Sequence, residues 1–259
     1  MLKELYTAAL GMQNQQTRLE VVANNMANSS TTGFKRDSVF ERNLIDARAH
    51  FYNVPGDAEQ NDSPIGSYTD FKQGAFQQTD NPLDLAIQDE GFFVLQDEEG
   101  KKFLSRAGHF TISKDGYIVA KDGKMLAGED GPINVQNEFI ANYGLIEDKR
   151  ATNVRITDDG EVFVNNQSIA RIAIAKVTEL NVLEKATGSD FILTDDSFVE
   201  YIPSDKVIIK QGWIESSNVD IIGEMVEMIE LQRHYEAGSK VIHTNDSTLD
   251  GAIKLGKYF

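Results

Sequence analysis

The stretch ANNMANSSTTGFKRD, residues 23–37, separates two parts of the chain that have different hydrophobic patterns. Asparagine, serine and threonine side chains hydrogen-bond readily to nearby backbone, which favours caps and turns over helix interiors. A helical pattern that starts at the beginning of the chain should therefore end here, and Gly33 can turn the chain. An aromatic residue and two cations follow directly: Phe34, Lys35 and Arg36.

Residues 2–27 are expected to form an amphipathic helix. Leu5, Met12, Leu19 and Met26 recur every seven residues and place an apolar stripe on one face. Such a stripe can pack on the helix's own domain or pair with a partner helix in a coiled coil. This segment alone favours packing on its own domain.

A second and longer heptad pattern, over residues 217–255, shifts the interpretation from packing on the helix's own domain to pairing with a partner helix. A companion series of heptad positions runs beside the main one. Met225 and Ile253 lie on this companion series, but polar residues occupy the positions between them. Two heptad helices at opposite ends of one chain suggest that the termini pair with each other. Ser217 and Asp220 resemble a capping box in which Ser217 is the N-cap. The main series is Ile221, Met228, Tyr235, Ile242 and Leu249.

Between the two helices, residues 83–210 have the pattern of an antiparallel β domain. Runs such as LDLAI, GFFVLQ and IARIAIAKV are rich in the apolar and β-branched residues that strands favour. Asp-Gly pairs separate such runs, and glycine tolerates the positive φ that tight hairpin turns need. The predicted turns are Asp115-Gly116, Asp122-Gly123, Asp130-Gly131 and Asp159-Gly160.

The expected fold class is therefore α+β. Long N- and C-terminal helices pair as a coiled coil, an extended connector follows the first helix, and a central antiparallel β domain is rich in hairpins. The connector contains turn signals and scattered aromatic residues, which are typical of an irregular segment. The expected bounds are 1–35 and 215–259 for the terminal helical domain, 36–80 for the connector and 81–214 for the β domain.

Composition argues against several classes of function. The formal net charge of −16 makes nucleic acid and anionic membranes poor partners. The chain has no cysteine, which excludes disulfides, thiol catalysis and thiolate metal sites. No apolar run approaches the roughly 18 to 20 residues of a membrane span, so direct membrane insertion is not expected. The first residues also lack the order of a secretory signal.

No catalytic, cofactor-binding or metal-binding residue is predicted. The motifs of nucleotide-binding loops, zinc proteases and serine hydrolases do not occur in the sequence. Glu230 and His234 are four residues apart on a helix, but a zinc site needs further ligands, so a solvated helix face is the better interpretation. A carboxylate pair in a cleft stays open at this point.

Four motifs occur in the order typical of flagellar rod and hook axial proteins, and each resembles a segment of that family. The first helix and its polar end, residues 6–37, resemble the family's N-terminal signature. Residues 81–96 resemble the entry to its β domain, and residues 103–128 the hairpin array that follows. Residues 210–242 resemble the C-terminal block, whereas residues 132–205 carry no matching motif.

The resemblance implies a structural subunit of the bacterial flagellar rod, not an enzyme, with no cofactor. Such subunits polymerise helically into an axial shaft that crosses the periplasm and transmits torque to the hook. The implied partners are copies of the same chain, other rod and hook proteins, and the flagellar type III export apparatus, without a cleaved signal peptide. The short interval Ser38–Asp80 favours the proximal over the distal rod protein. A soluble ligand-binding or wall-remodelling β module, dimerised by its terminal helices, is the alternative.

The apolar stripes and the polar stretch are the predicted subunit-packing surfaces. We expect the asparagines to satisfy backbone groups at the helix end. We expect Phe34 to insert into a neighbour, and Lys35 and Arg36 to meet acidic surfaces of adjacent subunits. Alternatively, residues 28–33 only cap a helix. The predicted packing residues are Leu5, Met12, Leu19, Met26, Asn24, Asn25, Asn28, Gly33, Phe34, Lys35, Ile221, Met225, Met228, Tyr235, Ile242 and Leu249.

Overall fold

The computed structural model describes residues 2–41, 65–135, 154–186, 188–193, 199–202 and 207–256. The chain divides into two compact units, here called the helical unit and the β-rich unit. Both ends of the chain belong to the helical unit, and the short segment that follows the first helix belongs to the β-rich unit. The helical unit comprises Met1–Ser29, Arg36–Phe71 and Val219–Phe259, and the β-rich unit comprises Ser30–Lys35 and Lys72–Asn218.

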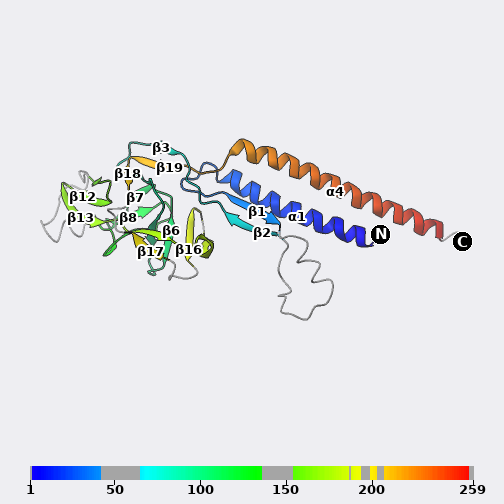
Figure 1. Cartoon of the computed structure of the whole chain (residues 1–259), viewed down its shortest axis with the longest axis horizontal. Helices are drawn as coiled ribbons and strands as arrows, with labels where there is room; N and C mark the ends of the chain where they lie inside the picture. The colour runs from blue at the N-terminus through cyan, green and yellow to red at the C-terminus, as the bar shows by residue number, and fades with distance from the viewer. Residues whose placement is uncertain are drawn as a thin grey trace. The chain divides into compact units, whose positions relative to one another are not determined.

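Two helices lie side by side in the helical unit (Figure 1). Helix α1 covers Leu2–Ala27 and helix α4 covers Ile221–Gly256. Asn25 hydrogen-bonds to Glu224, and a Cβ atom added at Gly238 would lie 3.1 Å from Cγ of Met12. The contacts therefore move towards the N-terminus of α1 as they move towards the C-terminus of α4, which makes the pair antiparallel.

Both predicted helices are present, but the predicted N-cap of the second one is wrong. Asp220 is the N-cap of α4, because its backbone carbonyl accepts the first helical bond from the N–H of Glu224 at 2.9 Å. Ser217 lies too early in the chain for this role. The N–H of the preceding residue, Ser216, donates to the carbonyl of Ala75 at 2.8 Å, which keeps this segment extended.

The predicted irregular connector contains strands. Strands β1 (Asp37–Glu41) and β2 (Ile65–Thr69) form a two-stranded antiparallel sheet in the helical unit. Strand β3 (Phe76–Gln78) pairs with β19 (Trp213–Glu215) in the β-rich unit. Two-stranded sheets bury few residues, so no apolar alternation marks these strands in the sequence. Residues 42–64 of the expected connector lie outside the described residues.

The remaining strands all belong to the β-rich unit, where a short 3₁₀ helix, η1 (Leu180–Val182), precedes β15. The strands are β4 (Leu85–Ile87), β5 (Phe92–Gln96), β6 (Lys102–Ser105), β7 (Phe110–Ile112), β8 (Ile118–Ala120), β9 (Met125–Gly128), β10 (Gly131–Pro132), β11 (Val154–Ile156), β12 (Glu161–Val164), β13 (Gln167–Arg171), β14 (Ile174–Val177), β15 (Leu183–Lys185), β16 (Asp190–Leu193), β17 (Val199–Ile202) and β18 (Ile209–Gln211).

Among the described residues, the β-rich unit contains a ten-stranded sheet, a three-stranded sheet and two strand pairs. The path of the large sheet is β15-β16-β6-β5-β9-β8-β7, with β14 joined to β5, β17 joined to β14 and β10 joined to β9. The small sheet has the order β11-β12-β13, and the pairs are β18–β4 and β19–β3. The strands pair antiparallel, as the sequence predicts.

Three of the predicted Asp-Gly hairpin turns are confirmed, and the fourth lies one residue earlier, because Gly131 is the first residue of β10. They join β7 to β8, β8 to β9, β9 to β10, and β11 to β12, and each of these pairs is antiparallel. The glycines of the four Asp-Gly pairs have positive φ, from 76° at Gly160 to 127° at Gly131. The turn chemistry read from the sequence therefore fixes the order of these strands.

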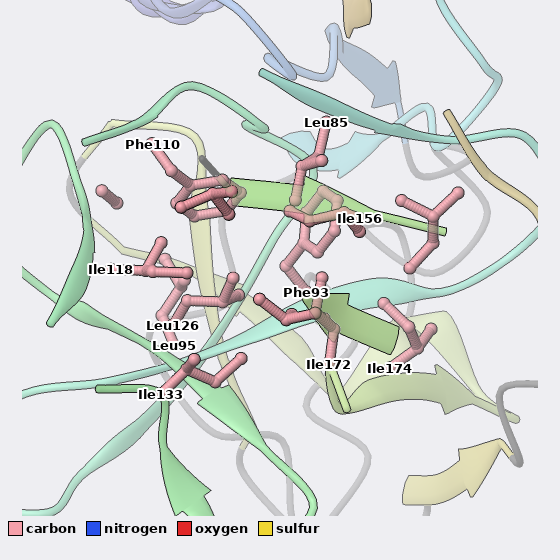
Figure 2. Packing of buried hydrophobic residues seen from close by; sticks show 14 of the residues in the cluster. Leu85, Phe93, Leu95, Phe110, Ile118, Leu126, Ile133, Ile156, Ile172 and Ile174 are labelled. Carbon is pink, nitrogen blue, oxygen red and sulfur yellow. The ribbon is translucent and has the colours of Figure 1, made fainter. Parts of the chain in front are cut away.

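One apolar core holds the β-rich unit together (Figure 2). The rings of Phe93 and Phe110 meet edge to face with centroids 5.4 Å apart. Ile156 brings the three-stranded sheet into the same cluster. Complete burial of each such large side chain contributes about 1.5–3 kcal/mol. Figure 2 labels Leu85, Phe93, Leu95, Phe110, Ile118, Leu126, Ile133, Ile156, Ile172 and Ile174.

Candidate functional site

The polar stretch that follows α1 contributes to two clusters of charged residues, one in each unit. Lys35 belongs to the β-rich unit and the next residue, Arg36, belongs to the helical unit. Lys35 forms an ion pair with Glu215, and Arg36 forms one with Glu224. In each unit, a cation from the N-terminal part of the chain is thus tied to a carboxylate from the C-terminal part.

Glu215 is the centre of the cluster in the β-rich unit and is only 1% exposed. Its Oε1 accepts hydrogen bonds from Nζ of Lys35 at 2.6 Å and from the N–H of Gly74 at 2.9 Å. Its Oε2 accepts from Nη1 of Arg106 at 3.3 Å. Nζ of Lys35 also donates to the carbonyl of Lys72 at 2.8 Å. Removing an ion from water costs several kcal/mol, so a carboxylate this deeply buried depends on these partners.

Arg106 is the second cation of this cluster. Its Nη2 donates to the carbonyl of Asp89 at 2.9 Å, and its guanidinium lies 5.3 Å from the ring centroid of Phe92. Burial lowers the pKa of Arg106, although the charge and the hydrogen bond of Glu215 act in the opposite direction. An arginine remains charged even so. Two cations therefore share the carboxylate of Glu215.

Residues Ser30–Lys35, here called the strap, lie within the β-rich unit, and Phe34 is their apolar anchor. Phe34 is 1% exposed. Nζ of Lys185 lies 3.9 Å from the centroid of its ring and donates to the carbonyl of Lys35 at 2.9 Å. The structure contradicts the expectation that Phe34 inserts into a neighbour and that Lys35 meets an adjacent subunit. Both side chains are buried by their own chain.

Gly33 allows the strap to lie close to the chain that follows β6. Its φ is +69°, and a Cβ atom there would lie 2.3 Å from the backbone nitrogen of Ala107 and 2.4 Å from the carbonyl carbon of Arg106. Its N–H donates to the backbone carbonyl of Glu215 at 2.8 Å. The geometry agrees with the predicted turn, and it adds a close approach that the sequence did not reveal.

Asn25 organises the cluster in the helical unit and is fully buried. Its Nδ2 donates to the carbonyl of Asp37 at 2.8 Å, and its Oδ1 accepts from the N–H of Asp37 at 2.9 Å. Nδ2 also lies 3.2 Å from Oε2 of Glu224. The side chain thus binds the first residue of β1 as a neighbouring strand would and links it to α4.

Arg36 binds the same carboxylate from the other side. Its Nε lies 2.5 Å from Oε1 of Glu224, its Nη1 donates to Oγ of Ser38 at 2.6 Å, and its Nη2 lies 3.5 Å from Oε2 of Glu227. Burial lowers the pKa of Arg36, but the hydrogen bond and charge of Glu224, with the charge of Glu227, raise it overall. The acidic partners expected on adjacent subunits are therefore supplied by the same chain.

Of the other two asparagines, Asn28 bonds to a backbone group at the end of α1 through its side chain. The backbone N–H of Asn28 and its side-chain Nδ2 both donate to the carbonyl of Asn24, at 3.1 and 2.9 Å. The carbonyl of Asn24 thus accepts its regular helical bond and a second bond from the side chain of Asn28. The side chain of Asn28 therefore supports the last turn of the helix, to which Asn24 contributes its backbone carbonyl.

Helix α4 packs on α1 through a stripe shifted by one residue from the predicted companion series. Leu231 is 5% exposed and Gly238 admits the side chain of Met12, whereas the predicted Met225 is 48% exposed. Leu231 and Gly238 are seven residues apart, so the heptad spacing is kept and only its position along the helix differs. In the predicted main series Met228 and Ile242 are half-buried, and Ile221 and Tyr235 are exposed.

The residues of the predicted apolar stripe on α1 are half-buried where the structure describes them. Met12, Leu19 and Met26 are half-buried, and the companion residue Val22 is 3% exposed. The side chain of Leu5, like that of Leu249 on α4, lies outside the described part of the structure. The role of this stripe in subunit packing stays a prediction.

A second apolar surface of α4 is left open to solvent. Ile222, Met225, Val226 and Ile229 are 48–75% exposed. Their spacing of three and four residues places them together on one side of the helix. We call these four residues the outer face of α4. Contiguous exposed apolar patches of this kind occur at protein–protein interaction sites.

The described residues offer little for catalysis. In the ranges that the structure describes, no group of three or more His, Asp or Glu side chains could hold a metal ion. Glu230 and His234 are both exposed, as a solvated helix face requires. None of the helices in the described part has the length and apolar character needed to cross a membrane.

Comparisons with known families match three separate parts of the chain. Residues 5–35 match the family model "Flagella basal body rod protein". Residues 86–164 match "Flagellar hook protein FlgE/F/G D1 domain", and residues 210–255 match "Flagellar basal body rod FlgEFG protein C-terminal". The terminal matches include Lys35, Glu215 and Glu224, which take part in the two clusters.

Curated relatives extend the match over nearly the whole chain. The chain is 32% identical to flagellar basal-body rod protein FlgG of Agrobacterium fabrum, over 95% of this chain and 96% of the relative. It is 31% identical to FlgG of Caulobacter vibrioides, over 98% and 99%. It is 26% identical to flagellar basal-body rod protein FlgF of Buchnera aphidicola subsp. Schizaphis graminum, over 97% and 96%. The identities therefore give no support to the preference for a FlgF-like, proximal rod protein.

Proposed function

The chain belongs to the flagellar basal-body rod proteins, a family of structural rod subunits, and we propose that it assembles into the rod through the outer face of α4. The near-complete alignment with two FlgG proteins supports the structural role. The family is not one of enzymes. The observation that carries the proposal is the exposed apolar patch on a helix whose other side already contacts α1.

The outer face is suited to a partner that covers it. Ile222 is 75% exposed and Val226 is 52% exposed. Burying such a side chain completely contributes about 1.5–3 kcal/mol, so four neighbouring apolar residues favour association strongly. A contact between two different surfaces of identical subunits repeats without closing unless its rotation closes a ring. Repetition of this kind gives the open helical assembly that a shaft requires.

We also propose that α1 and α4 form an antiparallel coiled coil within each subunit. The seven-residue repeats of both helices and the contact between Met12 and Gly238 support this pairing. The terminal helices would then form the inner layer of a tubular rod, with the β domain outside. Ile221, Met225 and Tyr235, which are exposed, remain proposed subunit-packing residues.

The proposed partners are copies of this chain and other flagellar axial proteins. The names of the relatives place those proteins in the basal-body rod. By analogy we propose the periplasmic rod as the location and the flagellar type III apparatus as the export route, without a cleaved signal peptide. The charge of −16 argues against nucleic acid as a partner.

A charge placed on the outer face tests the assembly surface. Ile229→Glu should abolish incorporation into purified hook–basal bodies while the monomer melts as the wild type does, because a buried unpaired carboxylate is costly only in the assembly. Ile208→Glu is the matched control, since Ile208 is 43% exposed in the β-rich unit and Ile229 is 51% exposed. Normal incorporation of Ile229→Glu would exclude the outer face as the assembly surface.

A further inference from the structure

We propose that the strap, Ser30–Lys35, is a latch, a segment that detaches from the β-rich unit as one piece while the rest of the unit stays folded. Glu215 is its lock, the residue whose negative charge holds the strap in place. The proposal concerns the closing of a single chain and does not depend on assembly into a rod. It rests on the contacts of the strap, on the hollow beside it and on the charges that Glu215 balances.

Two polar contacts of the strap reach Glu215, and others reach Lys72, Lys185, Ser189 and Asn218. The side chain of Glu215 binds Nζ of Lys35, and its backbone carbonyl accepts from the N–H of Gly33. Oγ of Ser189 donates to the carbonyl of Thr32 at 2.9 Å. Phe34 is the large apolar side chain of the segment and is covered by Lys185. Release of the strap would break these bonds but leave the apolar core cluster of the β-rich unit intact, because no strap residue belongs to that cluster.

The first half of the strap lies beside a hollow of about 660 Å³. Ser30, Thr31 and Thr32 line it together with Lys121 and Asp122 from the turn between β8 and β9. Ser30 is exposed, and Thr31 and Thr32 are half-buried beside this hollow. Detachment can begin at Ser30 without first moving a strand.

The charges explain why Glu215 is the lock. Lys35 is 1% exposed and Arg106 is 8% exposed, and both bind the carboxylate of Glu215. Without that negative charge, two cations would face each other in a buried site, which is strongly unfavourable. Arg106 is retained by the carbonyl of Asp89 and the ring of Phe92. Lys35 can regain water by leaving with the strap, so the strap is the part that moves.

The order of the chain makes this latch close late. Lys35 and Glu215 are 180 residues apart. A chain synthesised from its N-terminus presents the strap long before its lock exists. We therefore expect the strap to dock only after β19, the strand that carries Glu215, has paired with β3.

Amide hydrogen exchange in the full-length protein tests the latch. In Glu215→Gln, the N–H of Gly33 should exchange at least about tenfold faster, whereas the N–H groups of Phe93 and Leu95 in β5 should keep their wild-type rates. Glu184→Gln, at an exposed glutamate of the same unit, is the matched control and should leave Gly33 unchanged.

Lys35→Met is the second variant, because it removes the tie to the strap and leaves Glu215 and Arg106 as a balanced pair. It should keep the core folded and still speed the exchange of Gly33. Unchanged exchange at Gly33 in both variants would overturn the proposal. An equal acceleration at Gly33 and in β5 would also overturn it, because the strap would then open only with the whole unit.

Discussion

Asn25 exchanges two hydrogen bonds with the backbone of Asp37, at 2.8 and 2.9 Å, and thereby joins the end of α1 to the start of β1. The amide also reaches Glu224 at the beginning of α4. Three elements of the helical unit therefore meet at one buried side chain. A polar residue in a heptad helix thus fixes the position of a strand and a second helix.

Removing this amide should destabilise the helical unit. Asn25→Ala removes both hydrogen bonds of this buried amide to the backbone of Asp37 and its bond to Glu224, at a cost of about 1–3 kcal/mol. Thermal unfolding followed by far-ultraviolet circular dichroism should show the loss. Asn24→Ala is the matched control, because Asn24 is exposed on the same helix. Equal stabilities of the two variants would contradict the role of Asn25.

Gly33 should tolerate a side chain less well than another glycine with positive φ. Gly33→Ala meets both a φ of +69° and backbone atoms closer than 2.5 Å to the new Cβ. Gly123→Ala has a φ of +91° but nothing within 4 Å, so it should cost only the conformational strain of about 1–2 kcal/mol. Urea unfolding of the two variants separates the effects. A smaller loss in Gly33→Ala would show that the strap does not lie as described.

The core of the β-rich unit should depend on Phe93. Truncating this fully buried ring in Phe93→Ala should cost about 3–5 kcal/mol, since both transfer energy and packing are lost. Phe40→Ala, at a ring that is 40% exposed, should cost far less. Chemical denaturation followed by circular dichroism checks both values. Similar losses in the two variants would contradict the position of Phe93 in the core.

Asp190 should make stability depend on pH in an unusual direction. Burial raises the pKa of its carboxyl, and the hydrogen bond from Lys124, at 2.5 Å, offsets this only in part. The folded state then holds the proton more tightly than the unfolded state. The contribution of Asp190 to the free energy of unfolding is therefore largest below its ordinary pKa. This contribution is lost as pH rises through the raised pKa of the folded state.

A variant without this charge reveals the effect. Between about pH 4 and 7, Asp190→Asn should gain stability relative to the wild type as pH rises. Free energies of unfolding measured across this range provide the test, and Asp115→Asn, at an exposed position, is the control. A relative loss of stability of Asp190→Asn with rising pH would show that the ion pair with Lys124 dominates.

Local patterns predicted much of the fold. The heptads predict α1 and α4, because an apolar stripe depends on residues three and four apart. The Asp-Gly turns predict four hairpins, because each turn depends on adjacent residues. The pairing of β1 with β2 has no such local mark, since their partners come from both sides of a long interval, such as Asp37 with Thr69.

The site was harder to predict than the fold. The sequence indicates that the polar stretch is important, but not which surface covers it. Phe34 and Lys35 contact Lys185 and Glu215, which lie 150 residues or more further along the chain. No spacing rule connects residues that far apart. The sequence pattern therefore does not distinguish burial by the same chain from burial by a neighbouring subunit. Of the four residues of the outer face of α4, Met225 was predicted from the sequence as a packing residue.

The central claim is that the chain is a structural subunit of the flagellar rod. The most direct measurement is to purify intact hook–basal bodies from the source cell and to label this chain with antibody for electron microscopy. We predict label along the rod. Well-preserved basal bodies that lack the chain would contradict the claim, and a soluble dimer of fixed size in the same cells would then favour a separate β module.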